Sequence, residues 1–440
     1  MALFGRKKTS ETDADAAPAT ETAAPVPQIA RRSLEEQRAF LLEQVGAIRP
    51  FGMQIFDVPG LTLCEDITSD LDLPLVTTAR VGGWAVRGSD LVGATEAAPK
   101  ELFVVDTIAA GEAPGAPLVA GAAIQIEEGA MIPDGVDAVV PAAAGVLGED
   151  GYVRIHTETR LYDNLRRAGS ELADGTPLLA AGDVLTPRSV AVLAEVGLDK
   201  VLVRPRPRIV VFTVGDGLVA PGQALTRPQQ RYDAATALIT AAARADGATV
   251  YPLGIIGIEA REIRQTIADQ QIRADLIVVV GGGELIREVA DGMGELDEAI
   301  VSLNRESRFG FAALGSDRTP MVILPAGVVS AYVGYHAFVR PVVNKLNETD
   351  PLASGRVEGC VAERLEVPGG ITQYIPAVRS SDGTVRPVAS AGADSELAWD
   401  LARANVLMVI PEDWAGADAG SQVECIVLDD DGVQGFDTRP

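Results

Sequence analysis

Between residues 206 and 350, continuously apolar runs alternate with helix-like segments, and this alternation constrains the fold more than any other feature. The apolar runs PRIVVFTVGDG, DLIVVVGGG and RTPMVILPAG each end in glycine. The segments AATALITAAARADG, EAREIRQTIADQQ and VVSAYVGYHAFVRPVVNKL have the composition and length of helices. Continuous apolar strands separated by helices are typical of a parallel, doubly wound α/β sheet. We therefore predict such a domain at 206–350.

Ligands of doubly wound sheets bind outside the carboxyl ends of the strands. Glycine turns there present backbone amides to anions, and carboxylates there can hold magnesium. The candidate binding residues at these ends are Gly215, Asp216, Asp233, Gly281, Gly282 and Gly283, with Asp216 and Asp233 as weak metal-ligand candidates. The alternative is structural, because a glycine turn and an aspartate after a strand are also ordinary turn and cap residues.

The segments on either side of 206–350 have a different sequence pattern. Short apolar runs broken by Gly and Pro predict an antiparallel β region at about 74–160, and a small β barrel or sandwich at about 353–429. Ser33 and Glu36 fit a helix capping box, so we expect ordered structure to begin at Ser33. Residues 1–30 are rich in Ala, Thr, Glu, Asp and Pro, which predicts a disordered leader.

The charge balance excludes several classes of protein. The chain has 37 Lys and Arg against 62 Asp and Glu, a net charge of −25, which argues against nucleic-acid binding and against docking of the whole body on anionic lipid. Three scattered cysteines and two histidines do not suggest a zinc site. With neither a membrane span nor a secretory signal in the sequence, we expect a cytoplasmic protein. The start MALFGRKK is either solubilising or a weak membrane or partner contact.

Five segments of the chain, in order, resemble the MoeA/gephyrin E-domain family, the molybdopterin molybdotransferases. The resemblance covers about residues 31–430. The segments are LDLPLVTTARVGGWAVRGSDL, GAAIQIEEGAMIPDGVDAVVP, LRRAGSELADGTPLLAAGDVLTP, PRIVVFTVGDGLVAPGQ and LPAGVVSAYVGYHAFVRPVV.

The resemblance implies a MoeA-like four-domain elongated fold and a homodimer whose active site lies between domain III of one subunit and domain II of the other. It implies insertion of molybdate into adenylated molybdopterin with release of AMP, and magnesium as cofactor. It adds Ser330 to the substrate-binding candidates. The predicted parts are a leader (1–30), domain I (31–73 and 161–205), a β lid domain II (74–160), the α/β domain III (206–350), a C-terminal β domain IV (351–430) and a tail (431–440).

The chain departs from the family pattern where the chemistry is expected. The acidic residue of the family's MDGYA stretch falls on Gly82, and the threonine of its TGA stretch falls on Glu128. Its KPGKP stretch has become LNRESRF, which leaves Arg305 and Arg308 as candidate cations, if they are not merely solvated. Because the family substrates are polyanions, we expect molybdotransferase activity to be impaired.

Two other functions stay open at this stage. The chain resembles gephyrin and actinobacterial relatives that begin with a helix similar to Arg32–Gln37, which implies a non-catalytic dimeric scaffold for a partner peptide such as the C-terminal tail of the division protein FtsZ. A pterin or nucleotide sensor without turnover is the weaker alternative. The candidate peptide-groove residues, which could equally be helix core, are Pro325, Val328, Val329, Tyr332 and Tyr335.

Overall fold

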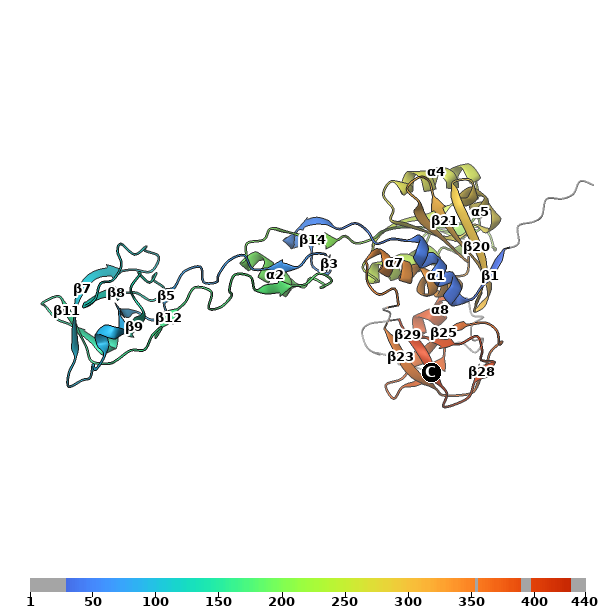
Figure 1. Ribbon diagram of the computed structural model, residues 1–440. Coiled ribbons are helices and arrows are strands. Elements are labelled where there is room, and N and C mark those ends of the chain that lie inside the picture. Colours follow the sequence, from blue (N-terminus) through green and yellow to red (C-terminus); the bar gives the residue numbers. More distant parts are fainter. Residues whose placement is uncertain (1–28, 353–354, 389–396, 429–440) are drawn as a thin grey trace, which may run out of the picture.

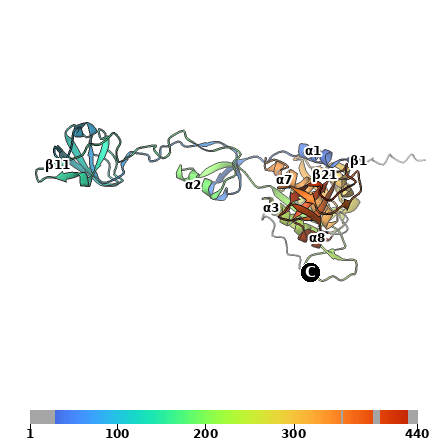
Figure 2. The same ribbon diagram turned by 90° about the horizontal axis from the view of Figure 1, so that it is seen from below.

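The computed structural model describes residues 29–352, 355–388 and 397–428. The chain forms an elongated molecule: a β body at one end, a small middle body, and a large body made of an α/β part and a β barrel (Figure 1). Viewed from below, the three bodies still lie in a row (Figure 2). The predicted leader lies almost wholly, and the predicted tail wholly, outside the described residues.

The α/β part contains a seven-stranded sheet. Its order is β1 (Ala30–Arg32), β20 (Gly294–Leu303), β21 (Arg305–Leu314), β22 (Thr319–Leu324), β19 (Leu276–Gly281), β15 (Arg208–Val214), β18 (Thr249–Ile256). β22, β19, β15 and β18 are parallel, whereas β21 runs antiparallel to both β20 and β22. The sheet is therefore mixed, which corrects the prediction of a parallel sheet. A tight turn at Asn304, with φ +52°, makes the unpredicted β20–β21 hairpin.

Helices cover both faces of this sheet, as a doubly wound fold requires. On one face the core includes residues of α1 (Leu34–Gln44), α3 (Ala235–Ala245), α6 (Val328–Gly334), a π-helical turn (Tyr335–Val339) and α7 (Arg340–Leu346). On the other face it includes residues of α4 (Ala260–Gln271) and α5 (Gly283–Asp291). The strands between them are buried on both sides, which explains their continuous apolar sequence.

The chain enters the sheet earlier than expected. The capping box at α1 is confirmed, since Ser33 Oγ accepts from Glu36 N at 3.1 Å and Glu36 Oε2 accepts from Ser33 N at 2.9 Å. However, Ala30–Arg32 already form β1, parallel to β20. Ordered structure thus begins before Ser33. The partner strand lies about 270 residues away in sequence, so no local pattern indicates this pairing.

The distal body is the β region predicted near 74–160. Its six-stranded sheet has the order β10 (Gly145–Leu147), β11 (Tyr152–Ile155), β7 (Lys100–Ile108), β8 (Ala122–Ile126), β6 (Gly83–Val86), β9 (Ala138–Pro141). Only β7 and β8 are parallel within this sheet. Apolar side chains such as Trp84 and Val140 fill its core.

Two smaller units complete the molecule. The middle body has a sheet of β2 (Phe51–Gln54), β14 (Lys200–Arg204) and β3 (Thr62–Leu63), with α2 (Pro187–Glu195) beside it. The C-terminal strands close a barrel of β23 (Arg356–Val361), β26 (Thr384–Pro387), β25 (Gln373–Arg379), β27 (Val406–Ile410) and β29 (Gln422–Val427). A short helix, α8 (Ala398–Arg403), packs near α6. Among the described residues, no helix is long and apolar enough to cross a membrane.

Candidate functional site

A glycine turn joins β19 to α5 at the carboxyl edge of the sheet. Gly281, Gly282 and Gly283 have φ values of +80°, +81° and +53°. A Cβ on Gly282 would lie 2.8 Å from the Ile286 side chain, so this position requires glycine. The Gly282 amide donates to Val214 O at 3.1 Å, and is therefore already used within the protein. The amides that follow it, at the start of α5, are the ones that could meet an anion.

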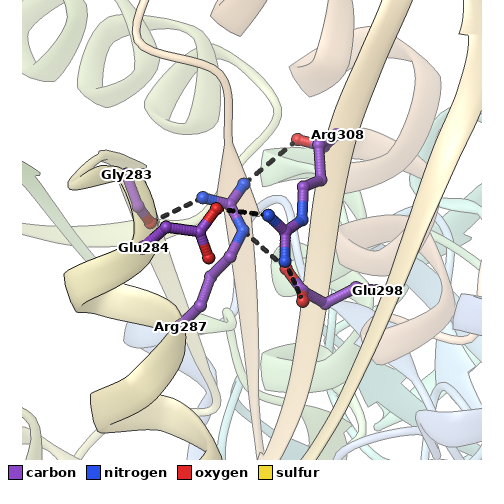
Figure 3. Close-up of polar contacts among 5 residues, drawn as sticks. All are labelled: Gly283, Glu284, Arg287, Glu298 and Arg308. Atoms are coloured by element: carbon purple, nitrogen blue, oxygen red, sulfur yellow. Dashed lines mark hydrogen bonds and ion pairs between the residues drawn. The ribbon is translucent and has the colours of Figure 1, made fainter. Parts of the chain in front are cut away.

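A cluster of two arginines and two glutamates lies next to this turn (Figure 3). Arg308 Nη2 is 2.5 Å from Glu298 Oε2, and Arg308 Nη1 also pairs with Glu284. Arg287 Nε is 2.5 Å from Glu298 Oε1, and Arg287 Nη1 donates to Gly283 O at 2.6 Å. The formal charges sum to 2 − 2 = 0.

Electrostatics reinforces this pairing. The hydrogen bond to Glu298 raises the pKa of Arg308 above its ordinary value; burial opposes this, and the charges of Glu298 and Glu284 add to it. Arg287 and Glu298 were not among the predicted site residues. The spacing of Glu284 and Arg287, one helical turn apart directly after the glycines, was the signal that could have found Arg287.

The side chains of the two predicted cations, Arg305 and Arg308, do not point to the same site. Arg305 and Arg308 lie three residues apart on β21, so their side chains point to opposite faces of the sheet. Their neighbours agree, since Phe309 packs in the core with α1 and Ala312 in the core with α5. Arg305 stands next to the hairpin turn, opposite Leu303.

The two predicted metal ligands differ in environment. Asp216 is exposed after β15, whereas Asp233 is only 4% exposed. Asp233 Oδ1 accepts from Thr213 Oγ1 at 3.2 Å and from Thr236 N at 3.0 Å, so it caps the start of α3 and does not fit a metal ligand. In the described part of the chain, no three His, Cys, Asp or Glu residues gather as a metal site would require. Asp216 alone could join a magnesium ion carried by phosphates, and magnesium stays a prediction.

The remaining candidates are placed as follows. The Gly215 amide donates to Ile256 O at 3.3 Å, and Ser330 is half-buried on α6. Val329 and Tyr335 are 1% and 0% exposed within the core, which corrects the expectation that they line a groove. Apolar side chains at helical spacing pack against the sheet, and these two lie on the inner side. The other groove candidates, Pro325, Val328 and Tyr332, are half-buried.

In the distal body, the structure brings together two positions where the chain departs from the family pattern. A Cβ on Gly82 would lie 3.5 Å from Glu128 N, an ordinary contact distance. Gly82 directly precedes β6 and Glu128 follows β8, and β8 lies at the opposite end of the molecule from α5 and its glycine turn (Figure 1).

Comparison with known families agrees with this architecture. Residues 32–197 match the MoeA N-terminal region (domain I and II), 210–345 a probable molybdopterin binding domain, and 359–428 the MoeA C-terminal region (domain IV). A crystal structure of the molybdopterin biosynthesis MoeA protein from Pyrococcus horikoshii superposes with a TM-score of 0.75 at 24% identity, over 90% of this chain and 99% of that one. This likeness concerns the fold alone.

Relatives with similar sequences show the family as well as the fold. Molybdopterin molybdenumtransferase 2 of Mycobacterium tuberculosis H37Rv is 32% identical over 407 residues, 89% of this chain and 98% of the relative. Molybdopterin molybdenumtransferase 1 of the same strain is 30% identical over 410 residues, 86% of this chain and 95% of the relative. The matches cover all three folded bodies rather than one shared domain. The chain therefore belongs to the MoeA family.

Proposed function

We propose that this protein is a molybdopterin molybdotransferase homologue of molybdenum cofactor biosynthesis whose own molybdate insertion is impaired. The family reaction, as the resemblance implies, transfers molybdate to adenylated molybdopterin and releases AMP. The observation that carries the proposal is the pairing of Arg308 with Glu298 and Glu284. The two cations beside the glycine turn, Arg308 and Arg287, are paired with carboxylates of the protein itself.

Binding of a polyanion at this turn needs positive charge that is free to meet it. The amides at the start of α5 favour an anion there. Glu284 lies in the same first turn and places a carboxylate on Arg308, so an incoming phosphate or molybdate has to displace it. Glu298 is the stronger obstacle, since its side chain is 15% exposed and holds both arginines.

The lid surface supports the same proposal. A lid that closes over a polyanion from a second copy would present Glu128, a negative side chain, beside Gly82, which has none. We therefore propose a homodimer in which this surface faces the partner's glycine turn. Sedimentation equilibrium of the full chain tests the dimer, and a monomer at micromolar concentration would rule it out.

Complementation decides the question of catalysis. We expect the chain to restore little nitrate reductase activity in a strain that lacks its molybdotransferase. A variant carrying Gly82→Asp, Glu128→Thr and Glu284→Gln serves as the matched gain-of-function arm, since the space at Gly82 admits a side chain. Robust rescue by the unaltered chain, at equal expression, would refute the impairment.

A scaffold function is the second candidate, and an exposed tryptophan favours it. Trp399 is 68% exposed on α8, which packs near α6 and the barrel. Exposed tryptophan is frequent at binding hot spots. We propose that this surface, with the half-buried Val328 and Tyr332, receives a partner peptide such as the FtsZ C-terminal tail. Calorimetric titration with that synthetic peptide should show binding that Trp399→Ala weakens; absence of heat and of competition would exclude this partner.

A further inference from the structure

Two chain segments connect the large body to the middle body. They are 45–50, between α1 and β2, and 205–207, between β14 and β15 (Figure 1). The distal body continues from the middle body, because its strands β6 to β11 lie in sequence between β4 (Ile67–Thr68) and β13 (Pro177–Leu179), which pair with each other. The direction in which the middle body leaves the large body therefore decides where the distal body lies.

The side chain of Arg204 crosses this junction. Arg204 is the last residue of β14, where it pairs with Thr62, so it belongs to the sheet of the middle body. Its Nη1 donates to Ile48 O, and its Nη2 forms an ion pair with Glu348. Both partners belong to the large body: Ile48 packs against its core and donates its amide to Leu346 O at 2.9 Å, and Glu348 follows α7. One guanidinium group thus holds the two bodies together.

The two members of this ion pair differ in exposure. The side chain of Arg204 is 7% exposed, whereas that of Glu348 is 66% exposed. Arg204 Nε is buried and has no hydrogen-bond partner among the described residues. A buried cation that loses its carboxylate is strongly unfavourable. When Glu348 turns into the solvent, Arg204 recovers its hydration only if the two bodies separate.

The backbone at Glu348 gives a second, independent observation. The Glu348 amide donates to Lys345 O and the Thr349 amide to Asn344 O, each at 3.0 Å, which is the Schellman pattern of a helix end. Glycine is usual at the position of Glu348, because its φ of +57° lies in the left-handed region. The end of α7 therefore does not explain a glutamate there, whereas the ion pair across the junction does.

We propose that Arg204 and Glu348 form a clamp that holds the middle body against the large body, and that release of Glu348 lets the middle body move together with the distal body. The clamp is closed while the carboxylate balances Arg204, and it is open when water hydrates both groups. Because Glu348 is exposed, dissolved ions reach the pair and weaken it. The clamp depends neither on molybdotransferase activity nor on the proposed homodimer.

Distances between two spin labels, measured by pulsed electron–electron double resonance, test the clamp. The labels are attached to Phe56→Cys in the middle body and Ile272→Cys in the large body, two positions that are 82% and 89% exposed. Cys64→Ser and Cys360→Ser remove the half-buried native thiols. Cys425 is 0% exposed and burial raises its pKa to about 11, so it stays unlabelled. Dilution with unlabelled chain removes distances between copies.

We expect one narrow distance distribution for the chain with an intact clamp. Arg204→Met and Glu348→Gly should each raise the population of other distances about tenfold. Glycine suits a φ of +57°, so Glu348→Gly removes the ion pair without weakening the end of α7. Arg206→Met is the matched control, because Arg206 is exposed in the connecting segment and donates to Pro59 O of the middle body at 3.5 Å.

Salt gives an independent readout. Sodium chloride at about 1 M should broaden the distances of the chain with an intact clamp and leave those of Glu348→Gly unchanged. Distances that stay narrow in both Arg204→Met and Glu348→Gly would show that packing alone fixes the junction, and would overturn the proposal. Equal broadening in Arg206→Met would overturn it as well. Cooperative thermal melting of Glu348→Gly separates the loss of the clamp from unfolding.

Discussion

Glu298 holds Arg308 and Arg287 at the same time, with a distance of 2.5 Å from its carboxylate to each guanidinium group. The three side chains come from β20, β21 and α5. Their exposures are 15%, 27% and 12%, so water screens these pairs less than it screens ordinary surface pairs. The carboxylates of Glu298 and Glu284 thus balance the charge of the two cations beside the glycine turn.

Removal of the Glu298 charge should expose an anion site. Glu298→Gln keeps the shape and changes the formal charge of the cluster from 0 to +1. We expect pyrophosphate to bind about tenfold more tightly by calorimetry. Glu284→Gln should have a smaller effect, because Glu284 is 69% exposed. Glu288→Gln, on the solvent side of α5, is the control. Equal affinities in all variants would contradict the assignment.

Neighbouring glycines of the turn should respond differently to alanine. Gly282→Ala forces a Cβ to within 2.8 Å of Ile286 at φ +81°, and we expect it to cost more than about 2 kcal/mol in unfolding free energy. Gly283→Ala meets no atom within 4 Å and should cost about 1 kcal/mol, from its backbone alone. Urea unfolding measures both. A larger loss at Gly283 would show that the turn is built differently.

The π-helical turn should make the protein sensitive to acid. His336 is 9% exposed and contacts the rings of Tyr332 and Tyr335. Burial, and secondarily the charge of Arg340, lowers the pKa of His336 to about 3. The unfolded chain takes up this proton below about pH 6.5 and the folded chain does not, so stability falls as the pH drops from about 6.5 to about 3.

A variant without His336 tests the direction of this pH dependence. Between pH 7 and pH 4.5, His336→Phe should lose about 2.5 kcal/mol less unfolding free energy than the unaltered chain. His156→Phe, in the distal body, controls for loss of a histidine elsewhere. Denaturant unfolding at the two pH values gives the difference. Equal losses of unfolding free energy in the unaltered chain and in His336→Phe would contradict the claim that burial lowers the pKa of His336.

Single substitutions should measure how much the α1 capping box contributes to the stability of the protein. Ser33→Ala removes the acceptor of the Glu36 amide and should cost about 1 kcal/mol. Glu36→Ala removes only the reciprocal bond, and we expect a smaller loss. Glu35→Ala, in the same turn but outside the box, is the control. Thermal unfolding that does not distinguish the three variants would refute the prediction.

Local patterns predicted a large part of this fold. The capping box, the glycine turn and the order of helices and strands around it depend on neighbouring residues, so spacing alone indicates them. The long helix expected over 328–346 was right in extent, although the structure inserts a π-helical turn at Tyr335–Val339. A π-helical turn adds one residue to a helix, and the apolar periodicity does not reveal where.

The sequence by itself determined the family, the mixture of α/β and β bodies, and the glycines that shape the turn. Only the tertiary structure decided that Arg308 is held by Glu298 and that Gly82 lies beside Glu128. Both contacts depend on strand order and register. Register is set by burial of whole strands against distant partners, so contacts between remote side chains follow from packing rather than from any local motif.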